Sequence, residues 1–192
     1  MQTEQSQKTW SANKIVGLFD HAILQPTYTD DEMQQRLTAL RRFPVASVCI
    51  KPYFVATAAK ALAGSGIPVG TVIGFPHGSA LPEIKAAEAE AAVRDGANDV
   101  DMVINVGKAL SGDWDYLRND TRVVLEVTRR HDGVIKVLFE TDFITADPVK
   151  IRLCEICAEL NVDFVKTSTG YGFVKRLTVP ITMLAPPSTM WY

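Results

Sequence analysis

The run DFVKTSTG at positions 163–170 places a lysine inside an apolar, strand-like stretch and follows it with hydroxyl groups and a glycine. A lysine is costly to bury unless it has a polar partner or a chemical role. In an apolar, electropositive pocket, the Lys166 amine can lose its proton near neutral pH and attack a carbonyl carbon, which forms a Schiff base. The alternative is a lysine at a strand end whose amine reaches solvent. The strands that precede this run favour the first interpretation.

Strand-like runs alternate with helical patterns along the chain, and short connections separate them. This order predicts a parallel sheet with helices packed against it. A polar leader or a short first helix is expected within residues 1–13. Strands are expected at 17–24, 45–51, 68–75, 98–105, 134–141 and 163–169, and helices at about 29–40, 54–62, 82–94, 115–130 and 149–160.

The last three strands decide between an open doubly wound sheet and a barrel. Side chains alternate between the faces of a strand, so Asp101, Lys136 and Lys166 each fall on the face opposite to an apolar one. A barrel gives these charged residues a common interior, whereas both faces of an open parallel sheet are covered by helices. The sequence therefore predicts an α/β fold of the TIM (β/α)-barrel type, with its site at the carboxyl ends of the strands.

An aspartate and two lysines in one interior suit the chemistry of carbonyl compounds. Lys166 would be the nucleophile, and Asp101 would move protons while the carbinolamine forms and loses water. Lys136, as a second cation, would keep the Lys166 amine neutral. The alternative is a buried network of ion pairs without catalysis.

The composition argues against a nucleic-acid or membrane role. The chain has 192 residues, a net charge of -2 and a pI near 5.9. A charge balance of this kind does not indicate a basic surface that would bind nucleic acid or an anionic membrane. No apolar run approaches the roughly 18 residues of a spanning helix, and residues 1–10 are polar and lack the apolar core of a signal peptide.

Cysteine usage predicts a cytoplasmic protein, because Cys49, Cys154 and Cys157 are an odd and sparse set. Cys154 and Cys157 fall late in an apolar helical pattern, without a second cysteine pair or a histidine pair nearby. We expect both to pack in the core and not to bind zinc. No glycine-rich phosphate-binding motif follows a strand, so a nucleotide cofactor is not expected.

Four segments carry a resemblance to a known family: VCIKP at 48–52, TVIGFP at 71–76, DMVIN at 101–105 and KTSTG at 166–170. In their order and spacing they resemble the deoxyribose-phosphate aldolases, from about Gly17 to about Lys175. The resemblance implies a class I aldolase on a TIM barrel, which is a carbon–carbon lyase. Such an enzyme reversibly cleaves 2-deoxy-D-ribose 5-phosphate into glyceraldehyde 3-phosphate and acetaldehyde, without a metal or another cofactor.

The resemblance also implies roles for individual residues. Lys166 matches the Schiff-base lysine, Asp101 the proton-transfer residue and Lys136 the lysine near the reacting carbon. The implied partners are a small sugar phosphate and aldehydes, and the resemblance allows a homodimer. Further positions that match substrate-binding residues of the family are Asp20, Cys49, Thr169 and Gly170.

The resemblance ends near Lys175, which predicts a partial barrel domain at 1–175 and an unrelated tail at 176–192. Six strands precede the tail, whereas a TIM barrel needs eight. The family's seventh strand carries a second active-site lysine, and its last loops hold most of the phosphate site. We therefore expect a destabilised or self-associating chain of reduced activity. Residues 177–184 could cover one sheet edge, but Pro180 limits this segment to edge pairing. The alternatives are an inactive remnant and a Schiff-base aldolase for another sugar phosphate.

Overall fold

The computed structural model describes residues 10–172 of the 192-residue chain. One sheet of six parallel strands forms its centre, and neighbouring strands in the sheet are also neighbours in sequence. The strands are β1 (Asp20–Ile23), β2 (Ser47–Ile50), β3 (Val69–Ile73), β4 (Asp99–Val103), β5 (Val134–Leu138) and β6 (Phe164–Lys166). The helices are α1 (Ala12–Val16), α2 (Asp30–Leu40), the 3-10 helix η1 (Pro52–Phe54), α3 (Val55–Ala61), α4 (Pro82–Arg94), α5 (Val106–Leu110), α6 (Trp114–Arg130) and α7 (Asp147–Glu159).

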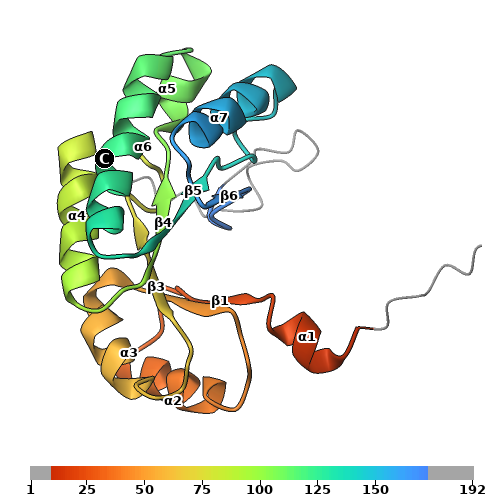
Figure 1. Cartoon of the computed structure of the whole chain (residues 1–192), viewed down its shortest axis with the longest axis vertical. Helices are drawn as coiled ribbons and strands as arrows, with labels where there is room; N and C mark the ends of the chain where they lie inside the picture. The colour runs from red at the N-terminus through yellow and green to blue at the C-terminus, as the bar shows by residue number, and fades with distance from the viewer. Residues whose placement is uncertain (1–9, 173–192) are drawn as a thin grey trace, which may run out of the picture.

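The sheet curls into a half barrel, with helices along its outer side and an open inner side (Figure 1). This architecture confirms the prediction of an incomplete TIM-type barrel with about six units. Within residues 10–172, β1 pairs only with β2 and β6 only with β5, so each edge of the sheet lacks a backbone partner there. The predicted tail at 176–192, with the edge segment 177–184, lies outside the described residues.

Two helix starts follow the signals in the sequence. The Thr29 hydroxyl accepts a hydrogen bond from the Glu32 backbone N–H at 3.3 Å, and Glu32 Oε2 accepts one from the Thr29 N–H at 2.8 Å. This reciprocal pair is the predicted capping box of α2. Pro82 is the first residue of α4, where its missing N–H costs no helical hydrogen bond.

Helix α5 was not predicted, and it shortens the strand before it. The side chain of Asn105 accepts a hydrogen bond from the Lys108 backbone N–H at 3.1 Å and caps α5. The chain therefore leaves the sheet earlier than the apolar pattern of 98–105 suggests, and β4 ends at Val103.

Alternation along the strands separates an apolar outer face from a charged inner face. Asp101 pairs in register with Lys136, and Leu138 pairs with Lys166, so the charged positions share one face of the sheet. This confirms the predicted orientation of the three charged residues. The outward side chains, which are buried in the core with the helices, are Val100, Met102, Ile104, Ile135, Val137 and Phe139.

Helix α7 buries one of its two cysteines. Cys157 packs in the core, as expected, whereas Cys154 is exposed, so the expectation is wrong for Cys154. The buried residues of α7 are Leu153, Ile156 and Cys157, and Cys154 lies outside this buried face. Within residues 10–172, no helix is both long and apolar enough to cross a membrane.

Lys85 of α4 and Asp120 of α6 form an ion pair whose side chains are both 0% exposed. Lys85 Nζ lies 2.6 Å from Asp120 Oδ2 and donates to the Val103 carbonyl oxygen at 2.9 Å. Burial lowers the pKa of Lys85 and raises the pKa of Asp120, in each case against the attraction of the partner. The pair thus joins two helices to the end of β4 while adding little net stability.

Lys85→Met is expected to lower the free energy of unfolding by about 3–5 kcal/mol, because it leaves the buried Asp120 carboxylate unpaired. Urea denaturation followed by circular dichroism measures the change. The control is the double variant Lys85→Met/Asp120→Leu, which buries no charge and should recover most of the lost stability. A single variant as stable as the parent would contradict this account.

Candidate active site

Lys166 lies at the end of β6, and its amine reaches two carboxylates on the inner face. Lys166 Nζ donates to Asp101 Oδ2 at 2.6 Å and to Asp20 Oδ2 at 2.8 Å. Asp101 belongs to β4, and Asp20 is the first residue of β1. The structure thus brings the predicted nucleophile together with the predicted proton-transfer residue and with the aspartate of the first strand.

Lys136 lies in the same interior, two residues closer to the amino ends of the strands, because Lys136 pairs with Phe164 and Leu138 pairs with Lys166. Lys136 Nζ lies 3.1 Å from Asp101 Oδ1 and 3.3 Å from Asp20 Oδ2. Asp101 therefore contacts one lysine through each of its carboxylate oxygens.

Asp99 is a member of this group that was not predicted from the sequence. It is buried at the start of β4, and its Oδ2 accepts a hydrogen bond from Lys136 Nζ. Burial raises the pKa of Asp99 above its ordinary value, although Lys136 acts in the opposite direction. The signal was present in the sequence, because Asp99 precedes Asp101 by two positions and therefore shares its face.

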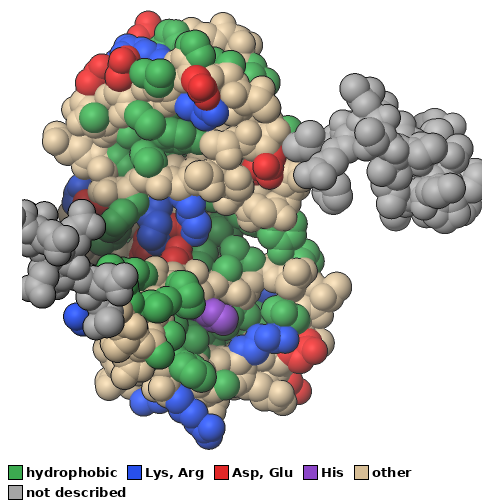
Figure 2. Space-filling view, turned by 90° about the vertical axis from the view of Figure 1, so that its right-hand side faces the viewer, with side chains coloured by type: hydrophobic (Ala, Val, Ile, Leu, Met, Phe, Trp, Pro, Cys, Tyr) green, Lys and Arg blue, Asp and Glu red, His purple; other side chains and the backbone are tan. Residues whose placement is uncertain are grey.

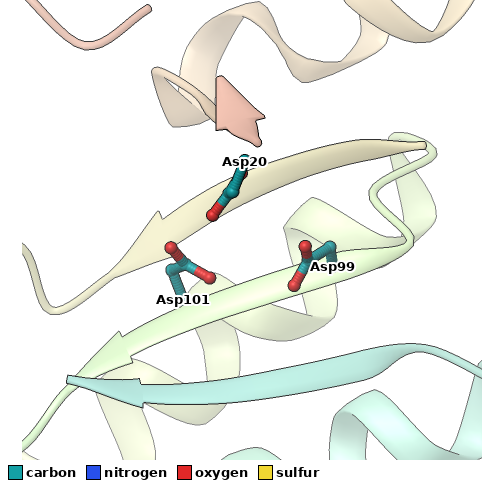
Figure 3. A group of neighbouring side chains, drawn as sticks. All are labelled: Asp20, Asp99 and Asp101. Carbon is teal, nitrogen blue, oxygen red and sulfur yellow. The ribbon is translucent and has the colours of Figure 1, made fainter. Parts of the chain in front are cut away.

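The carboxylates of Asp20, Asp99 and Asp101 point toward one another (Figure 3). Oxygen ligands of this kind suit a hard cation. Each of the three carboxylates, however, already contacts a lysine amine, so two ammonium groups stand where a cation would bind. The residues present fit an ion-pair cluster better than a metal site, and the expected independence from a metal stays a prediction.

Asp20 and Cys49 form the β1–β2 side of the cluster. Ser47 Oγ donates to Asp20 Oδ1 at 2.7 Å. Burial favours a higher pKa for Asp20, but the hydrogen bonds from Lys166 and Ser47 outweigh it and hold the pKa below its ordinary value. Cys49 is buried two residues beyond Ser47, and burial, with the nearby Asp101 and Asp20, raises the pKa of its thiol well above the usual range. Cys49 therefore shapes the interior as a neutral group.

The charge state of Lys166 differs from the expectation that Lys136 keeps it neutral. Burial lowers the pKa of Lys166, but the contacts with Asp101 and Asp20 act more strongly in the other direction and raise it above its ordinary value. Two carboxylates within hydrogen-bond distance outweigh one neighbouring cation. In this geometry the amine carries a proton at neutral pH.

The loop after β6 carries Thr169 and Gly170, two of the four predicted substrate-binding positions. Gly170 has a φ of 80°, a left-handed conformation that glycine adopts without strain. Thr169 hydrogen bonds to Glu140, a second residue for which the sequence predicted no role. The loop lies at the carboxyl ends of the strands, where barrel enzymes hold their substrates.

The open side of the half barrel exposes this charged interior. Figure 2 shows acidic and basic side chains gathered in a hollow in the middle of that side, with hydrophobic side chains around them. A cavity of about 420 Å³ extends toward the amino ends of the strands and is lined by Asp20, Ser47, Asp99, Lys136 and Phe164, among others. The cluster is thus accessible from the amino ends of the strands.

Comparison with known proteins places this geometry in a family. The family model described as DeoC/LacD family aldolase matches residues 15–183. The chain belongs to this family. The matched segment extends past Lys175, so the predicted domain boundary at that residue stays a prediction.

Relatives of this aldolase family are similar along most of the chain. A deoxyribose-phosphate aldolase of Rhodopirellula baltica is 48% identical over 158 residues, which cover 82% of this chain and 65% of the relative. One of Enterococcus faecalis is 43% identical over 155 residues, with 81% and 70% covered. The chain therefore spans about two thirds of the length of these relatives.

Solved structures of aldolases share the fold. A crystal structure described as a putative deoxyribose-phosphate aldolase from Coccidioides immitis has a TM-score of 0.79 and 28% identity, and the match covers 85% of this chain and 63% of that one. A structure described as "QR15, an Aldolase" has a TM-score of 0.76 and 31% identity, with 82% and 69% covered. These matches agree with a partial TIM-type barrel.

Proposed function

We propose that this chain carries the Schiff-base chemistry of a deoxyribose-phosphate aldolase. The reaction is the reversible cleavage of 2-deoxy-D-ribose 5-phosphate into glyceraldehyde 3-phosphate and acetaldehyde. The observation that carries the proposal is the contact of Lys166 Nζ with Asp101 Oδ2 at 2.6 Å on the inner face of a half barrel of this family. An amine beside a carboxylate has both the nucleophile and the proton acceptor that carbonyl addition needs.

The steps follow from this pair. The neutral fraction of the Lys166 amine adds to the aldehyde carbon of the sugar phosphate, and Asp101 takes up a proton from the nitrogen of the adduct. The resulting carbinolamine takes up a proton, loses water and becomes an iminium ion. The neighbouring hydroxyl of the sugar then loses its proton, the carbon–carbon bond breaks, and the electron pair moves to the iminium nitrogen. Glyceraldehyde 3-phosphate leaves, and protonation and hydrolysis of the remaining enamine release acetaldehyde.

The other charged residues hold this pair in position. Lys136 contacts the second oxygen of Asp101, and Asp20 accepts from Lys166 on the other side. We assign Thr169 and Gly170 to the binding of the phosphate-bearing substrate, because backbone N–H groups of a loop can surround an anion. We also propose that the protein acts in the cytoplasm and pairs as a homodimer, and that the reaction needs no cofactor because the lysine itself activates the carbonyl group.

Borohydride trapping with acetaldehyde tests the proposal. Reduction in the presence of acetaldehyde should leave an ethyl group on Lys166, which peptide mass spectrometry locates. A retro-aldol assay with deoxyribose 5-phosphate and with other sugar phosphates then identifies the substrate. A stably folded chain without any adduct would favour the alternative of an inactive remnant, in line with the unpaired sheet edges within residues 10–172.

Adduct formation should become faster as the pH rises. The pKa of Lys166 is raised, so the reactive neutral amine is a small fraction at neutral pH and grows about tenfold per pH unit. We expect the initial rate of trapping with acetaldehyde to follow this increase between about pH 6 and pH 9. A rate that reaches its plateau below pH 7 would show a lowered pKa and contradict the expected direction.

A further inference from the structure

We propose that Glu140 is a positioning residue that holds the loop 167–172 in the conformation that binds the phosphate-bearing substrate. The inference rests on the proposed function, and it adds a residue to which neither the motifs nor the comparisons give a role. It is carried by three features: the burial of the carboxylate, its contacts with Thr169 and the backbone conformation of Glu140.

The carboxylate of Glu140 is buried and committed to the loop. The residue is 1% exposed and follows the end of β5 by two positions. Its Oε2 accepts a hydrogen bond from the Thr169 backbone N–H at 3.3 Å and another from the Thr169 hydroxyl. Its Oε1 has no hydrogen-bond partner among the described residues. A half-satisfied buried carboxylate is costly for stability, so stability alone does not explain it.

The backbone of Glu140 is also strained. Its φ is 44°, in the left-handed region, where a residue with a long side chain loses about 1–2 kcal/mol. The other non-glycine residues of this kind within the described part of the chain are Asp132 and Asn161, whose short polar side chains tolerate the conformation. Strain that persists beside an active site suggests a functional constraint.

Thr169 connects Glu140 to residues that follow the carboxyl ends of β1 and β3. Its hydroxyl oxygen accepts a hydrogen bond from the Tyr171 backbone N–H at 3.0 Å. The Tyr171 hydroxyl donates to the Leu24 carbonyl oxygen at 3.2 Å, and its ring packs edge-on against Phe75 at 5.3 Å between centroids. Glu140 is therefore the buried end of a chain of contacts that fixes the loop between β5, β3 and β1.

The expected effect is a loss of affinity for the sugar phosphate without a loss of reactivity at Lys166. Glu140→Gly removes the carboxylate but accepts the left-handed backbone, so the variant should fold. The concentration of deoxyribose 5-phosphate that gives half-maximal borohydride trapping should rise by about tenfold, which corresponds to the loss of one charge-assisted hydrogen bond. Trapping with acetaldehyde, which carries no phosphate, should change by less than about twofold.

Three further variants separate positioning by Glu140 from a general disturbance of the fold. Glu140→Gln keeps an acceptor oxygen for Thr169 and should recover most of the affinity. Adding Thr169→Val to Glu140→Gly should cost no more than the larger single change, because both remove the same contact. Asn161→Gly, the matched control, also places a glycine at a left-handed position, between α7 and β6, and should leave both trapping reactions unchanged.

Equal losses with acetaldehyde and with the sugar phosphate, or unchanged affinity in Glu140→Gly, would overturn the inference. If the parent protein forms an adduct with neither acetaldehyde nor the sugar phosphate, the proposed function fails. Amide hydrogen exchange of residues 167–172 then tests the positioning role of Glu140 separately. Faster exchange of this loop in Glu140→Gly than in Asn161→Gly supports positioning, and equal exchange rules it out.

Discussion

Lys166→Arg eliminates the adduct that borohydride traps with acetaldehyde, and the chain stays folded. The arginine keeps a positive charge for Asp101 and Asp20, which contact the lysine at 2.6 and 2.8 Å. A guanidinium group does not lose its proton in a protein, so it forms no Schiff base. Intact mass spectrometry measures the adduct, and circular dichroism checks the fold.

The matched control for this variant is Lys108→Arg. Lys108 is partly exposed and also forms an ion pair, with Asp113 at 2.7 Å, but it lies on α5 outside the cluster. Its replacement should leave the adduct unchanged. If Lys166→Arg still gave the same adduct, another lysine would be the nucleophile, and the assignment of Lys166 would be wrong.

Asp101→Asn slows adduct formation at Lys166 by about 100- to 10,000-fold, the range for the loss of a general acid–base group. The amide cannot take the amine proton or return it to the carbinolamine. Loss of the carboxylate also removes a contact that raises the pKa of Lys166, and this change alone would favour the reactive amine. Slower trapping therefore reports proton transfer. The measurement is a time course of trapping with acetaldehyde.

Asp99→Asn provides the comparison for this second experiment. Asp99 hydrogen bonds to Lys136, and within residues 10–172 it forms no hydrogen bond or ion pair with Lys166. Its replacement should slow trapping by less than about tenfold, because it disturbs only the neighbouring lysine. Equal losses in the two variants would mean that the total charge of the cluster matters and that Asp101 has no particular role.

The residues of the inner face could be predicted, because the alternation of side chains between two faces is a property of each strand by itself. Alternate residues face the same side, so the positions of Asp101, Lys136 and Lys166 followed from their own strands. The same rule would also have placed Asp99. It could not show that Glu140 hydrogen bonds to Thr169, because a contact across 29 positions depends on how β5 and β6 are joined.

The charge state of Lys166 could not be predicted for a similar reason. The strand pattern placed Asp101 and Lys136 in one interior, but it could not show that the Lys166 amine lies within hydrogen-bond distance of both Asp101 and Asp20, of which Asp20 is 146 positions away in the chain. The end of β4 was also missed, because the Asn105 side chain caps helix α5 and the strand ends before it. The pattern of residue types thus predicts which side chains share a face of the sheet. The charge state of Lys166, in contrast, depends on the distances between charged groups, which only the structure gives.

The contact between Lys166 and Asp20 has a consequence for how the molecule folds. Each strand of the half barrel pairs with its neighbour in sequence, so most of the sheet can form progressively from nearby segments. The Lys166–Asp20 contact, in contrast, joins the first and the last strand of residues 10–172 through side chains. Fraying of either edge would separate these two groups while the central strands remain intact. The reactive centre is therefore expected to assemble last and to be the first part lost on mild destabilisation.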